Sequence, residues 1–230
     1  MSIWIVVPTY NEAENLESLL QRIFSTIDAH VLVVDDASPD GTGQLAERLR
    51  HRWPQLDVLH RPGKAGLASA YMDGLRLVLS RNPTAIVHLD ADGSHPPELI
   101  PTMLDALATT DLVLASRYVP GGTMGISPHR RLISAVGNWY IRGMLGTQIR
   151  DWSTGFKAWN PVLLARVLAT DLRSQGYACL MEMNWRALQA DATVAEIPLF
   201  FSERRAGDSK FSLNIIWEDI RLAWQLRRSR

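Results

Sequence analysis

The sequence predicts an α/β fold with a mostly parallel sheet flanked by helices. Short, nearly all-apolar segments recur along the first half of the chain, and segments with helical spacing separate them. Strand and helix alternate about every 25–30 residues, which is typical of βαβ units. In open sheets of this kind, ligands bind beyond the carboxyl ends of the strands. The residues that directly follow each strand are therefore the first candidates for a site.

The first half of the chain divides regularly into strands and helices. Its strand segments are apolar throughout, as expected of parallel strands buried on both faces. Its helix segments carry apolar residues three and four positions apart. We expect strands at 3–7, 30–34, 57–59, 85–89 and 112–115, and helices at 16–24, 45–49, 67–79 and 97–107.

The pattern changes after residue 117. The segment 119–127 is rich in Gly and Pro and predicts a loop. Periodicity then predicts helices again, with two further strands between them. We expect these helices at 132–144, 161–168, 180–188 and 212–228, and the strands at 156–159 and 193–200.

Charge is balanced overall but divided between the halves. The 230 residues carry 24 basic and 24 acidic side chains, which argues against a nucleic-acid partner. Residues 1–116 hold 8 basic and 15 acidic side chains, whereas residues 117–230 hold 16 and 9. The first half therefore suits a bound cation, and the second suits anions or an anionic surface. The single cysteine, Cys179, excludes a disulfide framework or a Cys-rich zinc site within one chain, and we expect it in the core.

Several common signals are missing from the sequence. We find no signal peptide and no uncharged apolar run near the ~18–20 residues of a spanning helix, so we expect a cytoplasmic chain. There is no G-x-G-x-x-G after the first strand and no G-x-x-x-x-G-K-[ST]. If a nucleotide binds, groups other than a glycine-rich loop must neutralise its phosphates.

Two carboxylates, Asp90 and Asp92, follow the apolar strand at 85–89. Alternate residues leaving a strand point the same way, so both can face one site. Hard oxygen ligands at a strand end suit Mg²⁺ or Mn²⁺ shared with a diphosphate, and such a cation stabilises charge on a leaving diphosphate. The alternative is a pair of solvated turn acids, because D-x-D is a common pattern.

The second strand also ends on acidic residues, Asp35 and Asp36. A carboxylate at this position can accept hydrogen bonds from a base or a ribose. The alternative is a turn acid, because the sequence that follows favours a turn.

Five cations in the second half form a candidate anion-binding set. Arg gives forked bonds to phosphate, and Lys gives a point charge. Each could singly be a surface cation, but Gly121, Gly122 and Gly207 flank them as in loops that close on an anion. The set comprises Arg117, Arg130, Arg131, Arg204 and Lys210.

The C-terminal segment 212–228 predicts an amphipathic helix with Trp217 and Trp224 on its apolar face and a basic end. It suits either an interfacial helix with aromatic anchors or a terminal helix packed on the domain. We therefore expect a domain over residues 1–210 and a C-terminal helix over residues 211–230. The same question arises for Trp139, Tyr140 and Met144 in the helix after Arg131.

His95, in Gly-Ser-His-Pro-Pro, could be a ligand or a base. The alternative, which we favour, is a turn residue that caps the following helix.

Five motifs in order resemble those of GT-A glycosyltransferases of family 2. They are Val7-Pro8-Thr9-Tyr10-Asn11-Glu12, Val33-Val34-Asp35-Asp36-x-Ser38-Pro39-Asp40-Gly41-Thr42, Asp90-Ala91-Asp92-x-x-His95-Pro96-Pro97, Ser116-Arg117-Tyr118 and Arg204-x-x-Gly207-x-Ser209-Lys210. Together they run from residue 3 to about 210 and are similar to those of the dolichol- or polyprenol-phosphate mannose synthases.

The resemblance implies inverting transfer of mannose from GDP-mannose to a polyprenyl or dolichyl phosphate, with Mg²⁺ or Mn²⁺. It implies catalytic roles for Asp90, Asp92 and Arg117, and metal ligation at Asp92 and Ser94. The nucleotide sugar is expected at Pro8, Tyr10, Glu12, Val34, Asp36, Asp90, Ala91, Asp92, Arg117, Arg204 and Lys210. The lipid phosphate is expected at Arg117, Arg130, Arg131 and Ser134.

The resemblance also implies a chain that is peripheral on the cytoplasmic face of a membrane, and it leaves open a separate membrane-anchor protein as a partner. Two residues depart from the family pattern. Ser94 stands where many relatives have a Gln metal ligand, and Ala178 stands where relatives often have Lys. The first puts the metal preference in doubt, and the second removes a candidate donor contact. Two alternatives remain open: transfer of another sugar, such as glucose from UDP-glucose, and a nucleotide-sugar-binding scaffold without turnover.

Overall fold

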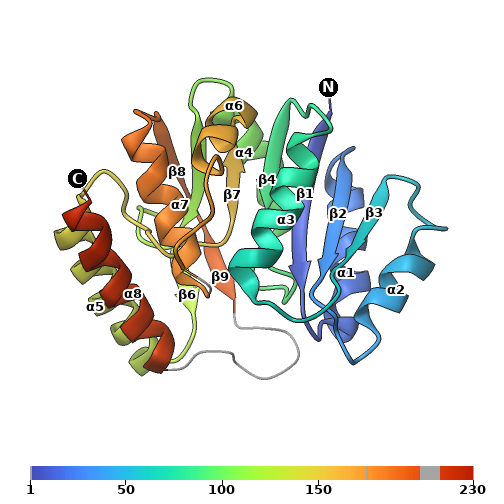
Figure 1. Cartoon of the computed structure of the whole chain (residues 1–230), viewed down its shortest axis with the longest axis horizontal. Helices are drawn as coiled ribbons and strands as arrows, with labels where there is room; N and C mark the ends of the chain where they lie inside the picture. Colours follow the sequence, from blue (N-terminus) through green and yellow to red (C-terminus); the bar gives the residue numbers. More distant parts are fainter. Residues whose placement is uncertain (1, 175, 203–212, 230) are drawn as a thin grey trace.

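A seven-stranded sheet with helices on both faces forms the centre of the computed structural model, which describes residues 2–174, 176–202 and 213–229 (Figure 1). This confirms the predicted α/β class. The strand order is β3-β2-β1-β4-β7-β5-β8. The strands are β1 (Ile3–Thr9), β2 (His30–Asp35), β3 (Leu56–His60), β4 (Ala85–His88), β5 (Leu112–Ser116), β7 (Lys157–Trp159) and β8 (Val194–Pro198).

All strands of this sheet run in one direction except β7. The strands β1 to β4 pair in parallel, as do β5 and β8. The short strand β7 lies between β4 and β5 and is antiparallel to both. It therefore starts at the edge of the sheet where β4 and β5 end.

Helices cover both faces of the sheet, which explains why its central strands are apolar throughout. One face is covered by α1 (Ala13–Thr26), α2 (Thr42–Leu49) and α4 (Ile100–Leu107), the last preceded by the 3₁₀ turn η1 (Pro97–Leu99). The other is covered by α3 (Leu67–Leu79), α6 (Pro161–Val167) and α7 (Ala178–Gln189). In α1, Leu16, Leu20 and Ile23 are fully buried. Each such side chain contributes roughly 1.5–3 kcal/mol of burial free energy.

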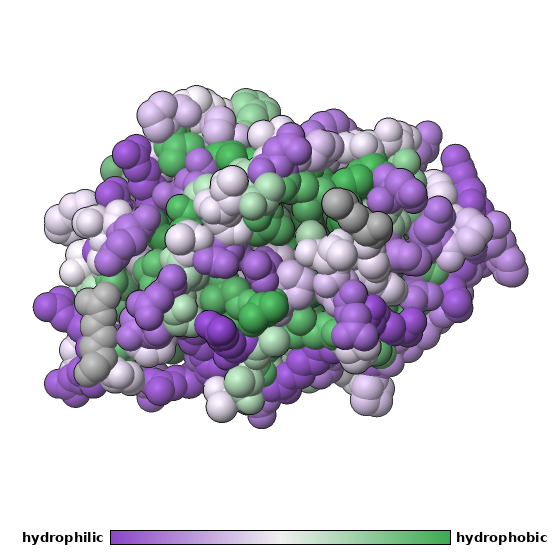
Figure 2. Space-filling view, turned by 90° about the horizontal axis from the view of Figure 1, so that it is seen from above, coloured by the Kyte–Doolittle hydropathy of each residue, from purple (hydrophilic) through white to green (hydrophobic). Residues whose placement is uncertain are grey.

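The remaining two helices, α5 (Pro128–Leu145) and α8 (Leu213–Arg228), lie side by side at one end of the molecule (Figure 1). Ile141 of α5 and Leu226 of α8 are buried in the same hydrophobic core. Within the described residues, no helix combines the length and the apolar character needed to cross a membrane. At the opposite end of the molecule, the surface over β3 and α2 is mostly hydrophilic (Figure 2).

Two sequence predictions are wrong in the region after β5. The predicted loop contains β6 (Thr123–Gly125), and the predicted single strand is divided into β8 and β9 (Phe200–Ser202). β6 and β9 pair in parallel as a separate small sheet. Leu199 marks the division, since its N–H donates to Ser116 and its carbonyl accepts from Thr123. Strands of three residues that pair across the chain leave too little periodicity to be recognised in sequence.

Candidate active site

Four of the residues singled out by the sequence directly follow strands of the main sheet, at one of its edges. Because β1, β2, β4 and β5 run in the same direction, their carboxyl ends meet at that edge, at the bottom of Figure 1. Tyr10, Asp36, Asp90 and Arg117 follow these ends. The reversed strand β7 brings the segment 150–156 to the same edge, between β4 and β5.

Asp90 is held from several sides. Tyr71 of α3 donates its hydroxyl to Asp90 Oδ1 at 3.0 Å. Burial, together with the charge of Asp90, raises the pKa of Tyr71 well above its ordinary value, so the phenol stays a donor. Gly155 passes so close that an added Cβ would lie 3.1 Å from Asp90 Oδ2. Gly155 therefore packs closely against the carboxylate, and a side chain at this position would require Asp90 to shift.

His95 lies in the bend before η1, but the prediction that its side chain caps the following helix is wrong. Its ring is 2% exposed, and Nδ1 accepts the backbone N–H of Asp90 at 3.1 Å. The amide it accepts from is thus that of Asp90 and not one in the following helix. The ring also contacts Phe201 of β9 at 5.9 Å between centroids, and Arg117 lies 5.5 Å from the same Phe201 ring. One aromatic side chain therefore joins the Asp90 loop to Arg117.

Asp92 is oriented by Ser94. The backbone N–H of Ser94 donates to Asp92 Oδ1 at 3.0 Å, and its hydroxyl donates to the same oxygen at 2.6 Å. Because the Ser94 hydroxyl uses its proton for the hydrogen bond to Asp92, the lone pairs of the Ser94 oxygen can still bind a cation or accept another hydrogen bond. Within the described residues, no group of three His, Cys, Asp or Glu side chains is arranged for a metal ion. The oxygens of Asp90, Asp92 and Ser94 suit a hard cation that takes its other ligands from a phosphate and water.

Arg117 is paired with a residue that the sequence analysis missed. Its Nε and Nη2 donate to the two carboxylate oxygens of Asp151 at 2.8 and 2.7 Å, and Nη2 also donates to Ser153 Oγ at 2.7 Å. The backbone N–H of Arg117 donates to Asp151 as well. Within the part of the chain that the structure describes, Nη1 has no hydrogen-bond partner. Arg117 therefore presents one directed donor group.

Both members of this pair are charged. Burial raises the pKa of Asp151, but the charge and hydrogen bonds of Arg117 outweigh it and hold that pKa below its ordinary value. Burial lowers the pKa of Arg117, but the charge and hydrogen bonds of Asp151 have the larger effect and raise that pKa above its ordinary value. Glu196 of β8 fixes the loop, since its carboxylate accepts the backbone N–H groups of Arg150 and Asp151. The pair is thus held on a rigid support.

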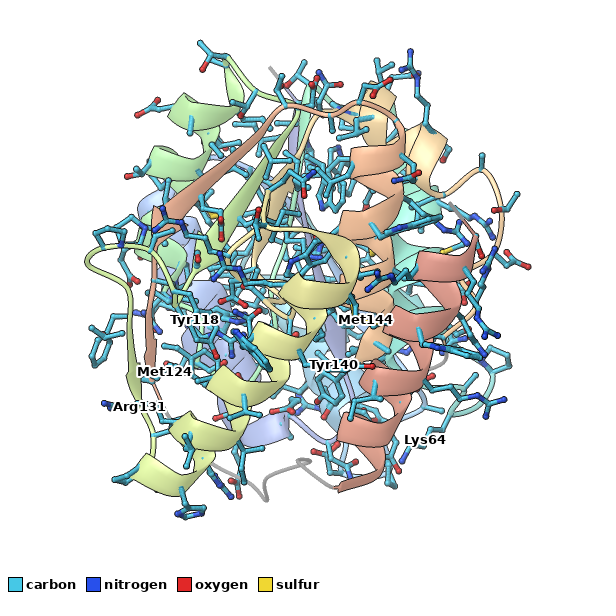
Figure 3. All side chains as sticks on the ribbon, turned by 90° about the vertical axis from the view of Figure 1, so that its left-hand side faces the viewer. Lys64, Tyr118, Met124, Arg131, Tyr140 and Met144 are labelled. Carbon is cyan, nitrogen blue, oxygen red and sulfur yellow. The ribbon has the colours of Figure 1, made fainter. Side chains whose placement is uncertain are left out.

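The start of α5 is tied to Arg117 through its neighbour. The hydroxyls of Tyr118 and Ser134 lie 2.7 Å apart, and Nη2 of Arg131 donates to the Met124 carbonyl of β6 at 2.6 Å. Figure 3 shows Tyr118, Met124 and Arg131 together at one end of α5. Arg130 lies in the same first turn of the helix. The four residues predicted for a lipid phosphate therefore belong to one contiguous region.

The residues predicted for a nucleoside lie at the ends of β1 and β2. Pro8 pairs with Val34 in the sheet, and Lys64 Nζ lies 3.9 Å from the centre of the Tyr10 ring. Asp36 is 4% exposed, and its carboxylate accepts the backbone N–H groups of Ala65 and Gly66 and an Arg61 guanidinium N–H. In this arrangement Asp36 holds the segment that leads into α3.

Two other residues predicted for the nucleotide sugar are buried. Glu12 is 4% exposed, and its carboxylate accepts a hydrogen bond from Asn15. Ala91 is buried between Asp90 and Asp92. Arg204 and Lys210 lie outside the described residues.

The site also contains residues that sequence reasoning did not identify: Tyr71, Asp151, Ser153 and Gly155. The run Asp-Trp-Ser-Thr-Gly-Phe directly before a predicted strand was a usable signal. It could not be assigned to the site without knowing that β7 runs against its neighbours.

Comparison with known proteins gives consistent matches. A family model described as Glycosyl transferase family 2 matches residues 4–171. A polyprenol monophosphomannose synthase of Mycolicibacterium smegmatis is 43% identical over 212 residues, covering 90% of this chain and 80% of the relative. An undecaprenyl-phosphate mannosyltransferase of Micrococcus luteus is 41% identical over 222 residues, covering 96% and 91%.

A solved structure supports the fold. A mannosyltransferase from Pyrobaculum calidifontis, in complex with GDP-Man and Mn²⁺, superposes with a TM-score of 0.61 at 19% identity. The match covers 99% of this chain and 73% of that chain. At this level of identity the likeness concerns the fold alone.

Proposed function

This chain belongs to glycosyl transferase family 2, and on that premise we propose that it transfers mannose from GDP-mannose to a polyprenyl phosphate. The product would be a polyprenyl phosphate β-mannose, formed with inversion. The single observation that carries the proposal is that the Phe201 ring contacts both Arg117 and His95, the residue that holds the backbone of Asp90 at the start of the Asp90–Asp92 loop. The names of the two relatives above 40% identity support the acceptor class.

The donor diphosphate is assigned to the Asp90–Asp92 loop together with Mg²⁺ or Mn²⁺. Asp92, Ser94 and Asp90 would hold the ion, which when bound supplies charge stabilisation for the leaving diphosphate. Tyr71 keeps Asp90 in place, and Ser94 orients Asp92. The guanosine is assigned to the ends of β1 and β2, beside Tyr10.

The acceptor is assigned to Arg117 and the start of α5. A phosphate oxygen of the lipid attacks the anomeric carbon of mannose, and the bond from that carbon to the GDP oxygen breaks. Because a phosphate monoester is already anionic at pH 7, no general base is needed. Two unit negative charges ~4 Å apart repel by ~4 kcal/mol at an effective dielectric constant of 20. Arg117 Nη1 and Arg130 are positioned to offset this repulsion and to orient the attacking oxygen.

A lipid acceptor requires that the protein contact a membrane, and α5 has an exposed apolar side that could make this contact. Leu132, Val136 and Trp139 lie on one side of α5 and are 66%, 56% and 74% exposed. An amphipathic helix with an exposed Trp is suited to the interface between headgroups and acyl chains. We assign residues 1–210 to the catalytic domain and residues 211–230 to a C-terminal element, of which α8 (Leu213–Arg228) lies beside α5, and we place the protein peripherally on the cytoplasmic face.

The test is an assay with labelled GDP-mannose, Mg²⁺ and polyprenyl phosphate, followed by extraction of label into organic solvent. The expected result is metal-dependent formation of a labelled lipid. Asp92→Asn should abolish that formation, while Asp28→Asn, on the exposed connection between α1 and β2, should not change it. If labelled lipid formed at the same rate with Asp92→Asn, or in the presence of a chelator, the reaction would not need the proposed metal ion.

A donor panel decides between the alternatives. Preferential transfer from UDP-glucose would replace mannose in the proposal and leave the acceptor unchanged. Binding of GDP without product, under any metal or lipid, would indicate a scaffold without turnover.

A further inference from the structure

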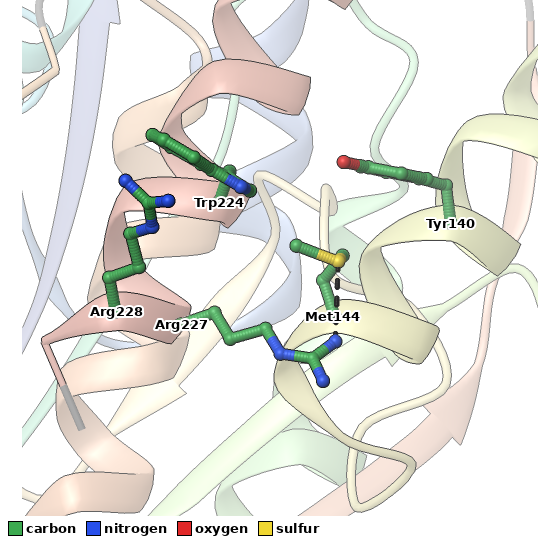
Figure 4. A pocket seen from close by; sticks show the side chains of 5 residues that line it. All are labelled: Tyr140, Met144, Trp224, Arg227 and Arg228. Atoms are coloured by element: carbon green, nitrogen blue, oxygen red, sulfur yellow. Dashed lines mark hydrogen bonds between the residues drawn. The ribbon is translucent and has the colours of Figure 1, made fainter.

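A groove of about 490 Å³ lies between α5 and α8, away from the candidate active site. Tyr140 and Met144 of α5 form one wall, and Trp224 of α8 forms the other, with Arg227 and Arg228 at one end (Figure 4). Tyr140 and Met144 are six and ten residues beyond Ser134, which corresponds to roughly 9 and 15 Å along the helix. The groove is thus a separate feature from the predicted acceptor residues.

The two arginines of the groove are exposed. Arg228 stacks on Trp224, with its guanidinium carbon 3.4 Å from the ring centre. Arg227 Nη1 donates to the sulfur of Met144 at 3.5 Å, and a thioether sulfur is a weak acceptor. Neither guanidinium contacts a carboxylate among the residues for which side chains are described. A third cation, Arg173, reaches the same helix end by donating to Ser229.

Two acidic residues on α8 and on the neighbouring helix α7 are already engaged. Glu218, three turns earlier on α8, accepts the backbone N–H of Gly176. Glu182 of α7 is fully buried and pairs with Arg186. The chain between Arg117 and Arg150 contains no acidic residue at all. Among the described side chains, Arg227 and Arg228 therefore have no competing carboxylate, and the groove between α5 and α8 attracts anions.

The walls of the groove are apolar and continue onto an exposed apolar surface. Tyr140 and Met144 lie beside the stripe of Leu132, Val136 and Trp139 on α5, as their spacing on a 3.6-residue helix requires. Trp224 is itself 46% exposed. A free inorganic anion needs no such apolar surroundings, whereas a lipid presents a charged headgroup next to hydrocarbon.

We propose that this groove binds the headgroup of an anionic phospholipid, with Arg227 and Arg228 on its phosphate and Tyr140, Met144 and Trp224 against its glycerol and upper acyl chains. The site deepens the proposed function and rests on it, because it presumes a chain that works on a membrane-borne acceptor. One helix, α5, would then contact the phospholipid near its end and the acceptor phosphate near its start. The bound phospholipid sets the orientation in which the active-site edge meets the membrane.

The test is sedimentation of the full chain with vesicles of phosphatidylcholine, with and without phosphatidylglycerol. The expected result is stronger binding when phosphatidylglycerol is present. Arg227→Gln/Arg228→Gln should reduce that binding on the order of tenfold or more, because each basic residue near an anionic surface contributes about a factor of five. Binding to pure phosphatidylcholine should change little. Trp224→Ala should weaken binding to both kinds of vesicle.

The matched control is Arg81→Gln/Arg166→Gln, which removes the same charge from exposed positions elsewhere, one of them also beside a tryptophan. Equal loss of vesicle binding in both double variants would show that binding depends on overall charge and not on the groove, and would overturn the proposal. Displacement of the protein from vesicles by inorganic phosphate, at constant ionic strength, would overturn it in favour of a free-anion site.

A separate readout distinguishes failure of this inference from failure of the proposed function. Transfer to a polyprenyl phosphate dispersed in detergent, without phospholipid, tests the chemistry alone. No transfer by the unsubstituted chain would reject the proposed function. A double variant that binds phosphatidylglycerol vesicles as tightly as the unsubstituted chain would reject the groove, whatever the transfer assay shows.

Discussion

Arg117 serves the site as part of a neutral pair. Its charge is matched by Asp151, which is fully buried, and its orientation is set by that carboxylate and by Ser153. An arginine held in this way costs little conformational entropy when an anion arrives, because its rotamer is already fixed. Asp151 is thus a positioning residue that acts through Arg117.

Asp151→Asn should lower kcat by about a hundredfold and change the KM for GDP-mannose much less. The amide preserves shape, but it replaces an acceptor oxygen with a donor and leaves Arg117 without a counter-charge. Removing one partner of a buried pair also costs on the order of 3 kcal/mol of folding free energy. Steady-state kinetics well below the Tm of the variant separates the two effects.

The control is Asp111→Asn. The Asp111 carboxylate accepts hydrogen bonds from Thr193 at the opposite end of the sheet. The substitution therefore removes similar hydrogen bonds at a position away from the site. Partial recovery of kcat in Asp151→Glu would support positioning. A fall in Tm with unchanged kcat would limit Asp151 to a structural role.

Among the elements, β7 decides how the site is assembled. Its reversed direction brings Asp151, Ser153 and Gly155 between the ends of β4 and β5. Without that reversal, the same residues would lie at the far edge of the sheet. The helix α5, which precedes β7 in the chain, differs from it: much of one side of α5 is exposed, and two of its glycines, Gly137 and Gly143, have open space where a Cβ would lie.

Alanine should therefore stabilise the protein at one glycine and impair transfer at another. At Gly143 an added Cβ meets nothing within 4 Å, so Gly143→Ala should raise the free energy of unfolding by about 0.5–1 kcal/mol through reduced backbone entropy. At Gly155 the same methyl group would lie 3.1 Å from Asp90, so Gly155→Ala should lower kcat several-fold by displacing that carboxylate. Urea unfolding and transfer kinetics measure the two effects. Wild-type kcat in Gly155→Ala would show that Asp90 need not be fixed.

At the scale of the whole molecule, the two halves of the chain interleave in the main sheet. The acidic first half supplies β1 to β5, and the basic second half supplies β7, which lies between β4 and β5, and β8, which lies at the edge beside β5. Lys157 of β7 lies where they meet, paired in register with His88. It is fully buried, and its Nζ donates to the Leu180 carbonyl at 2.6 Å. Burial lowers the pKa of Lys157 from 10.5 to about 7.

This lowered pKa makes stability depend on pH in a predictable direction. Below pH 7, Lys157 is charged in both states and the folded protein bears the full cost of burying that charge. Above pH 7 the folded protein releases the proton, whereas the unfolded chain keeps it until its ordinary pKa. The unfolded state then binds more protons, so the free energy of unfolding rises with pH, by at most about 1.4 kcal/mol per unit.

Lys157→Met should remove this dependence. The stability of the unsubstituted chain relative to the variant should increase between pH 7 and pH 9, as measured by urea unfolding at each pH. Lys64→Met, which removes an exposed lysine, is the control. Parallel stability curves for the unsubstituted chain and Lys157→Met would show that burial does not shift the pKa of Lys157.

The sequence by itself determined the α/β class, most of the helices and strands, and the positions of Asp36, Asp90, Asp92 and Arg117 at strand ends. These follow from local periodicity and from the rule that parallel strands end at one edge. Only the tertiary structure decided that β7 runs backwards, that β6 pairs with β9, and that Asp151 holds Arg117 from 34 residues away. Such contacts form between segments whose spacing along the chain carries no periodic signal, so they depend on how the whole sheet packs.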